Sequence, residues 1–149
     1  MIEPDSVRDK KQPGTLQSRL FDHIDLRVRN RTRAQEFFAK ILPAIGFTLD
    51  KSAEVWGAFE KDGGGKPSEF FGFTEDANHR PNETRIAFWA ETRGQVDRVA
   101  KIVREAGGQN LEGPQIWSEY SPGYYALFFE DPDGNKLEVC CRGSAIVAE

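Results

Sequence analysis

Two short segments of this chain alternate between apolar and polar residues, as half-buried strands do. They are residues 21–28 and 84–90. The side chains that could do chemistry share the faces opposite the apolar ones and are His23, Asp25, Arg27, Arg85 and Trp89. Charged groups on a solvated sheet face need no partner, but on an enclosed face they must be paired or bound to a ligand. The pattern therefore leaves two interpretations, a wet surface and a ligand-binding surface.

The elements that carry these residues form an internal repeat. At a constant offset of 62 positions the same residue types recur, in the pairs Ile24 and Ile86, Leu26 and Phe88, Ile41 and Val103, and Gly46 and Gly108. Apolar stripes at helical spacing predict helices over residues 31–42 and 93–106. Pro43 is expected to end the first helix or kink its last turn. Such a repeat across strand, helix and stop indicates two copies of one structural unit.

Each helix is followed by three strand candidates. These are residues 47–53, 55–60 and 69–74 in the first unit, and residues 111–118, 124–130 and 136–141 in the second. The last two are joined by Asp-Pro-Asp-Gly at 131–134, which suits a type I turn. We therefore predict an α+β fold of two tandem βαβββ units. The expected division is a flexible arm at 1–19, one domain at 20–142 with units at 20–74 and 84–142, and a tail at 143–149.

The composition argues against two classes of partner, nucleic acids and membranes. The net charge is −4 and the basic residues are scattered, which argues against nucleic acid. No stretch reaches the roughly 20 apolar residues that a membrane span needs, and residues 1–19 lack the apolar core of a secretory signal. Cys140 and Cys141 are sequence neighbours, too close for an ordinary disulfide, so free thiols in a reducing cytoplasm are expected.

The chain resembles the vicinal oxygen chelate superfamily, which includes glyoxalases, bleomycin-resistance proteins and extradiol dioxygenases. The resemblance covers about residues 20–142. It is carried by the opening Asp-His-Ile-Asp-Leu at 22–26 and by the ending at 122–139, with its Asp-Pro-Asp-Gly turn and the glutamate Glu138 on the following strand. It implies two curved sheets facing each other around a cavity, where the members that do chemistry hold a divalent metal.

The resemblance also implies where metal ligands would lie, on the first and last strands of each unit. Those positions offer His23 and Glu138, with Glu138 as the catalytic carboxylate, but Arg85 stands where the enzymes usually carry a second histidine. The fourth position falls near Glu69, Phe70 or Phe71, and the sequence leaves this register open because a slip of one residue reverses the face. A site of His23, Glu138 and Glu69 would suit Zn, Ni, Fe or Mn.

Two functional hypotheses remain at this point. The first is a metal-dependent lyase, isomerase or dioxygenase, with Glu69 as a candidate general base. The second is a protein that binds a small anionic or oxygen-rich molecule with an incomplete metal site. Arg85 favours it because a guanidinium pairs with anions, and we expect Arg85, in place of a metal, to neutralise Glu138. The residues expected to contact the ligand are Arg85, Asp25, Arg27, Trp89, Trp117 and Tyr120. Relatives commonly pair, so a homodimer is expected as well.

Overall fold

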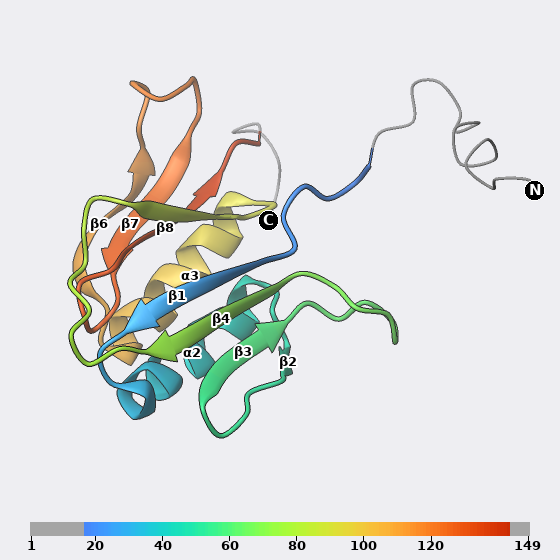
Figure 1. Ribbon diagram of the computed structural model, residues 1–149. Helices are drawn as coiled ribbons and strands as arrows, with labels where there is room; N and C mark the ends of the chain where they lie inside the picture. The colour runs from blue at the N-terminus through green and yellow to red at the C-terminus, as the bar shows by residue number, and fades with distance from the viewer. Residues whose placement is uncertain (1–16, 144–149) are drawn as a thin grey trace, which may run out of the picture.

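The computed structural model describes residues 17–143. In chain order its elements are β1 (His23–Val28), α2 (Arg31–Ile45), β2 (Leu49–Asp50), β3 (Trp56–Glu60), β4 (Phe70–Glu75), β5 (Arg85–Trp89), α3 (Arg93–Ala106), β6 (Gln109–Ile116), β7 (Tyr125–Glu130) and β8 (Lys136–Cys141). Two βαβββ units follow one another, as predicted (Figure 1). The flexible arm expected at 1–19 lies outside the described residues up to residue 16, and the tail lies outside them from residue 144.

Each unit forms a four-stranded sheet of the same topology. The strand orders are β1-β4-β3-β2 and β5-β8-β7-β6. In both sheets the first strand of the unit pairs with the last strand in parallel, and the other neighbours are antiparallel. The shortest strand is β2, with two residues where seven were expected. The two sheets are therefore open and curved, with β1 and β5 as one edge of each.

The helices begin at side-chain caps that lie at corresponding positions of the two units. Asn30 accepts a hydrogen bond from the backbone N–H of Arg33, and Thr92 accepts one from Gln95. The first helix was predicted to stop at residue 42 but continues to Ile45 with Pro43 inside it. The proline removes only the N–H that would bond to the carbonyl of Ala39, an exposed residue whose carbonyl water can reach.

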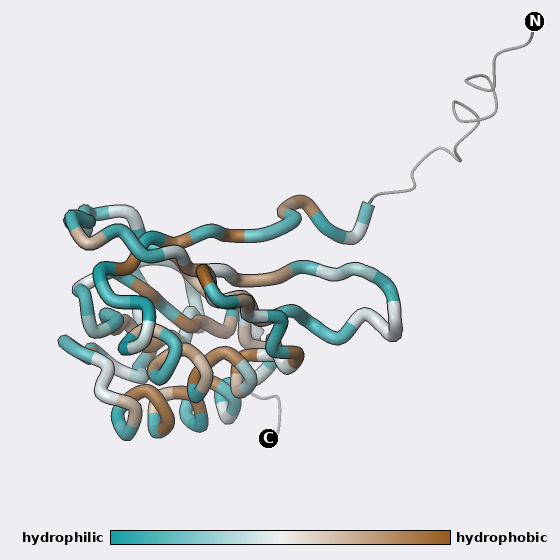
Figure 2. Tube along the Cα trace, turned by 60° about the horizontal axis from the view of Figure 1, so that its bottom comes forward, coloured by the Kyte–Doolittle hydropathy of each residue, from teal (hydrophilic) through white to brown (hydrophobic). Residues whose placement is uncertain are grey.

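Both helices pack on the same side of the strands and join the two units in one core. Figure 2 shows the helices grouped together on one side of the strands. α2 packs on β3 and β4, α3 packs on β6, β7 and β8, and the helices contact each other. The core takes side chains from both units, and Ile24 and Ile86 are both half-buried against it. This equivalence confirms the repeat that the offset of 62 predicted.

The turn between β7 and β8 also ties the units together. Asp131 is fully buried and accepts hydrogen bonds from the backbone N–H groups of Asp133 and Asn135. Asp133, itself buried, accepts from the backbone N–H of Arg29 at 2.7 Å and pairs with the Arg33 guanidinium. Because Arg29 and Arg33 belong to the first unit and the turn to the second, the Asp-Pro-Asp-Gly turn acts as a polar latch between the units.

Two smaller expectations concern membranes and cysteines. Within residues 17–143, no helix is both long and apolar enough to cross a membrane. Cys140 and Cys141 are free and buried, as expected. They point to opposite faces of β8, since Cys141 belongs to the core shared with the helices and Cys140 to a smaller apolar cluster.

Candidate ligand-binding site

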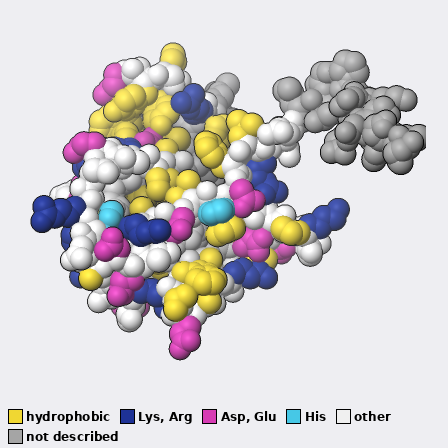
Figure 3. Space-filling view, viewed as in Figure 1, with side chains coloured by type: hydrophobic (Ala, Val, Ile, Leu, Met, Phe, Trp, Pro, Cys, Tyr) yellow, Lys and Arg dark blue, Asp and Glu magenta, His cyan; other side chains and the backbone are white. Residues whose placement is uncertain are grey.

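The register of the two sheets defines the face on which the candidate residues lie. The side chains at 24, 26 and 28 of β1 and at 86 and 88 of β5 pack into the helix-side core. The intervening residues therefore lie on the opposite side of each sheet, here called the helix-free face. Figure 3, viewed from that side, shows a row of charged and histidine side chains across the middle and a gathering of hydrophobic side chains above it.

The pairing of first and last strands settles which positions correspond. In the first sheet Asp25 lies opposite Gly72, and in the second sheet Ala87 lies opposite Glu138. Because Asp25 and Ala87 are equivalent at the offset of 62, the first-unit counterpart of Glu138 is Gly72. The sequence had left Glu69, Phe70 and Phe71 as the alternatives, and none of them occupies this position.

Two of the residues expected there have other surroundings. Phe71 is fully buried in the helix-side core. Glu69 precedes β4, and its side chain is 42% exposed with one carboxylate oxygen 3.9 Å from the Arg19 guanidinium. A residue with that exposure outside the strand offers no ligand equivalent to Glu138.

His23 lies at the start of β1 and is held by two contacts. Its Nδ1 is 2.8 Å from a carboxylate oxygen of Asp22. Its ring stacks on Phe70 of the neighbouring strand, with the centroids 4.4 Å apart and the planes 6° from parallel. The carboxylate on Nδ1 favours the tautomer with its proton there, which leaves Nε2 as the nitrogen able to accept a proton or a ligand.

Glu138 is the deepest charged residue on the helix-free face and is only 5% exposed. The hydroxyl of Tyr124 donates a hydrogen bond to its Oε2. Burial raises the pKa of Tyr124 well above its usual value, and hydrogen bonds to Cys140 and Glu138 add to the effect. Burial likewise raises the pKa of the Cys140 thiol. Both groups therefore stay neutral at physiological pH, and the Tyr124 hydroxyl remains protonated as the donor to Glu138.

A small apolar cluster covers this carboxylate. Its buried members are Tyr124, Ala126, Phe128 and Cys140, with Trp117 packed against them. The Trp117 ring meets Phe128 edge-on at 5.0 Å, and Tyr120 lies 5.4 Å from Tyr124 and 6.1 Å from Phe128. Trp117 and Tyr120, which the sequence proposed as ligand-contacting residues, thus belong to one aromatic wall with Tyr124 and Phe128. The wall is folded onto the second sheet by the segment 117–124.

Tyr124 is the residue that sequence reasoning missed. The signal was present in the strand alternation. Tyr124, Ala126 and Phe128 lie at period-2 spacing, and Phe128 is paired directly with Glu138 in the antiparallel ladder. Extending that alternation two residues further brings Tyr124 to the face that carries Glu138.

Arg85 does not pair with Glu138, although an ion pair between them was expected. Its guanidinium lies over the Phe128 ring, 4.6 Å from the centroid. Among the described residues no ion pair involves Arg85. Arg85 is exposed, and its guanidinium interacts with the face of the Phe128 ring as a cation–π pair.

The other residues proposed to contact the ligand, Asp25, Arg27 and Trp89, have partners of their own. Asp25 and Arg27 pair with one another at 2.9 Å, and Asp25 also accepts a hydrogen bond from Thr74. Trp89 is 59% exposed, and its indole N–H donates to Glu91. The structure thus gathers Arg85, Trp117 and Tyr120 around Glu138, while Asp25 and Arg27 follow β1 in the other sheet.

A divalent metal does not fit the donor set at the four corresponding positions. These positions hold His23, Gly72, Arg85 and Glu138. Glycine has no donor atom, and a guanidinium is a permanent cation that repels metal ions. Within residues 17–143 no three His, Cys, Asp or Glu side chains are grouped closely enough to hold a metal. Two protein ligands alone would hold a divalent ion weakly.

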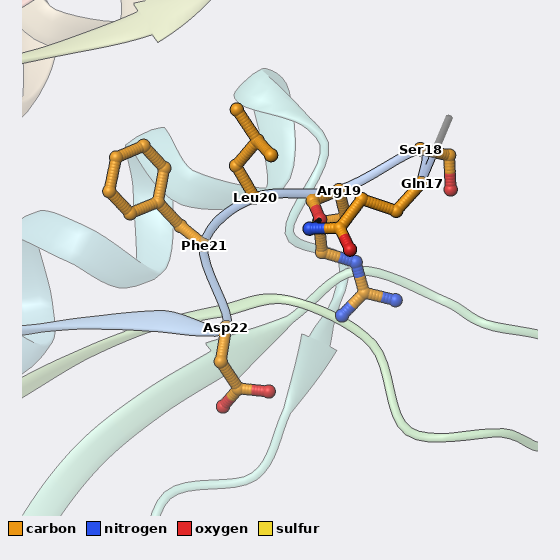
Figure 4. A pocket seen from close by; sticks show the side chains of 6 residues that line it. All are labelled: Gln17, Ser18, Arg19, Leu20, Phe21 and Asp22. Atoms are coloured by element: carbon orange, nitrogen blue, oxygen red, sulfur yellow. Dashed lines mark hydrogen bonds between the residues drawn. The ribbon is translucent and has the colours of Figure 1, made fainter. Parts of the chain in front are cut away.

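Two shallow surface depressions lie elsewhere on the molecule. One, of about 350 Å³, is lined by residues 17–22 before β1 (Figure 4). The other, of about 400 Å³, is lined by Arg29 and residues 77–80. Neither is lined by Arg85 or Glu138, so neither is the inter-sheet cavity that the resemblance implied.

Comparison with known proteins adds one family and several structures. The family model described as Glyoxalase/Bleomycin resistance protein/Dioxygenase superfamily matches residues 20–139. No curated protein matches the sequence.

A glyoxalase/bleomycin resistance protein from Albidiferax ferrireducens T118 is 23% identical, with a TM-score of 0.67 over 83% of this chain and 98% of that one. The fosfomycin resistance protein FosX from Listeria monocytogenes is 17% identical, with a TM-score of 0.62 over 87% of this chain and 97% of that one. FosX from Mesorhizobium loti is also 17% identical, with a TM-score of 0.60 over 87% and 96%. At these identities the structures share the fold.

Proposed function

Because the chain belongs to the Glyoxalase/Bleomycin resistance protein/Dioxygenase superfamily, we propose that it binds a small anionic or oxygen-rich molecule on its helix-free face without a metal ion. One observation carries this proposal. Of the four positions that correspond between the units, two hold metal-ligand side chains and two hold Gly72 and Arg85. The arginine supplies positive charge at the site directly, where other members of the superfamily use a metal ion.

The surroundings of Arg85 suit an anion. The ring of Phe128 holds the guanidinium from one face, and no carboxylate of the described residues competes for it. A stacked guanidinium keeps its in-plane N–H donors, which match carboxylate and phosphate oxygens in pairs. The neighbouring Trp117 and Tyr120 provide apolar surface for the rest of the ligand.

A metal-dependent lyase or dioxygenase is the second candidate, and the setting of His23 favours it. A carboxylate on one ring nitrogen is the usual support of a metal-ligating histidine, and Asp22 provides such a carboxylate at 2.8 Å. Glu138 is retained as well. The arrangement is nevertheless short of ligands, because Gly72 and Arg85 occupy the remaining positions.

Calorimetric titration of the purified protein tests the first candidate. The probes are inorganic phosphate, an aliphatic carboxylate, an aromatic carboxylate and fosfomycin, the last because two structural neighbours are fosfomycin resistance proteins. At least one anion should bind, and Arg85→Gln should weaken it about tenfold or more, since a charge-assisted hydrogen bond is lost. The control is Arg98→Gln, an exposed arginine on α3. Equal affinity of parent, Arg85→Gln and control would reject the role of Arg85.

A further inference from the structure

The carboxylate of Glu138 already has a hydrogen-bond donor within the protein. The carboxylate is buried, and the hydroxyl of Tyr124, itself only 7% exposed, donates to its Oε2. Removing that donor without replacing it would leave a buried acceptor unsatisfied, which is costly. The phenol thus occupies an acceptor site of Glu138 Oε2, and a cation that binds this oxygen must compete with it.

The segment that carries Tyr124 is itself fixed in place. The backbone N–H of Trp117 donates to the Tyr124 carbonyl at 2.8 Å, and the Trp117 indole N–H donates to the Ala126 carbonyl at 3.1 Å. Arg93 donates to the carbonyl of Gly123 at 3.2 Å. These hydrogen bonds fix the backbone around Tyr124, and so they fix the position from which the phenol reaches the carboxylate.

Two arginine side chains also lie against the rings of the same aromatic cluster. The Arg142 guanidinium lies 5.4 Å from the Tyr124 ring centroid, and the Arg85 guanidinium lies 4.6 Å from that of Phe128. Both arginines repel an approaching metal or ammonium ion. The carboxylate is therefore blocked by a hydrogen bond within the cluster and by positive charge at its surface.

The geometry points to Tyr124 as a specificity-determining residue, one that holds Glu138 in a closed hydrogen bond and thereby excludes divalent cations from the site. This inference rests on the proposed function, because it explains how a superfamily site that retains Glu138 works with anions. It also predicts that supplying the missing imidazole at position 85 is not enough to create a metal site. The phenol must be removed too.

Zn²⁺ titration of four chelator-treated proteins tests this. They are the parent, Arg85→His, Tyr124→Phe and the double variant that combines Arg85→His with Tyr124→Phe. A fifth protein, which combines Arg85→His with Tyr120→Phe, is the matched control. We expect the double variant to bind Zn²⁺ about tenfold to a hundredfold more tightly than Arg85→His, the factor expected for one hydrogen bond to a charged group. The control pair should bind as Arg85→His does, since Tyr120 is exposed and lies at the rim.

Equal Zn²⁺ affinity of Arg85→His and the double variant would overturn the role of Tyr124, and so would an equal gain from Tyr120→Phe. If Tyr124→Phe fails to fold, Tyr124→Met removes the hydroxyl with a flexible side chain that adapts to the apolar cluster, and it is read in the same way. The outcome is independent of the anion titrations, which use Arg85→Gln and no metal. A failure of anion binding and a failure of the Tyr124 inference are therefore distinguishable.

Discussion

At the scale of single residues, the hydrogen bond from Tyr124 to Glu138 determines how the buried carboxylate is satisfied. A buried carboxylate needs donors, and among the described residues the donor that reaches Glu138 is a phenol. The arginine expected to neutralise it is stacked on Phe128 instead. The site therefore separates its charges, with the carboxylate closed inside the aromatic cluster and the guanidinium available outside it.

Removal of the phenol hydroxyl should cost stability. Tyr124→Phe leaves the buried Glu138 without its donor, and we expect a loss of about 1–3 kcal/mol in the free energy of unfolding. Tyr120→Phe, at a residue that is 59% exposed, should change it by less than about 0.5 kcal/mol. Urea unfolding of the three proteins measures both. Similar values for the two variants would show that Glu138 does not depend on Tyr124.

Some of the residues around Glu138 could be predicted from the sequence, and others could not. Arg85 could be placed on the face of Glu138 because the repeat and the strand alternation fix that face. Trp117 and Tyr120 were proposed from the aromatic residues of the segment that precedes β7. The partner of Arg85 could not be predicted, since a stacked and a paired guanidinium differ by side-chain rotation, which no spacing encodes. Tyr124 lies one residue before β7 and continues its alternation, but the hydrogen bond from its hydroxyl to Glu138 also depends on side-chain rotation.

At the scale of elements, the repeat predicted the strands and helices well and the fourth site position poorly. The offset between units is 62 for β1 and β5, and for the starts of α2 and α3. It is 66 for Gly72 and Glu138, as 138 − 72 shows, because the segments between helix and last strand differ in length. Sequence alone cannot say where the added residues lie, and a single-residue error reverses the face of a strand.

The turn that latches the units should give a characteristic pH dependence. Burial raises the pKa of Asp131 above its ordinary value, although the hydrogen bonds from Asn135 and Asp133 oppose the shift. The folded state therefore binds the proton more tightly than the unfolded state. The contribution of Asp131 is fully present below the unfolded value of about 3.8 and is lost as the pH rises through the higher folded value.

Comparison with Asp131→Asn isolates this contribution. An asparagine oxygen can still accept from the backbone N–H groups of Asp133 and Asn135, but it does not titrate. The advantage of the parent over the variant in unfolding free energy should thus be larger near pH 4 than at pH 7. Chemical unfolding at both pH values measures it. An advantage that grows with rising pH would contradict the sign.

At the scale of the whole molecule, the two units share one core through their helices, while their helix-free faces and edges remain open. Leu20 and Phe21 are 81% and 75% exposed beside the start of β1, an unusual setting for two large apolar side chains. An uncovered apolar pair at a sheet edge invites a partner chain.

We expect a homodimer on these grounds. Light scattering at micromolar concentration should report twice the chain mass of 16.8 kDa, and Leu20→Ser with Phe21→Ser should shift the protein toward the monomer. The control is Val55→Ser, at another exposed apolar side chain (63%). Scattering that finds only a 16.8 kDa species at all concentrations would argue for a monomer.

The most direct test of the central claim is calorimetric titration of the unmodified, chelator-treated protein with Zn, Ni, Fe(II) and Mn ions. Because Gly72 and Arg85 occupy two of the four corresponding positions and Tyr124 is hydrogen-bonded to Glu138, we predict no stoichiometric binding below the millimolar range. Tight binding of one ion per chain, lost in both His23→Ala and Glu138→Gln, would contradict it and would establish a metal site in this protein.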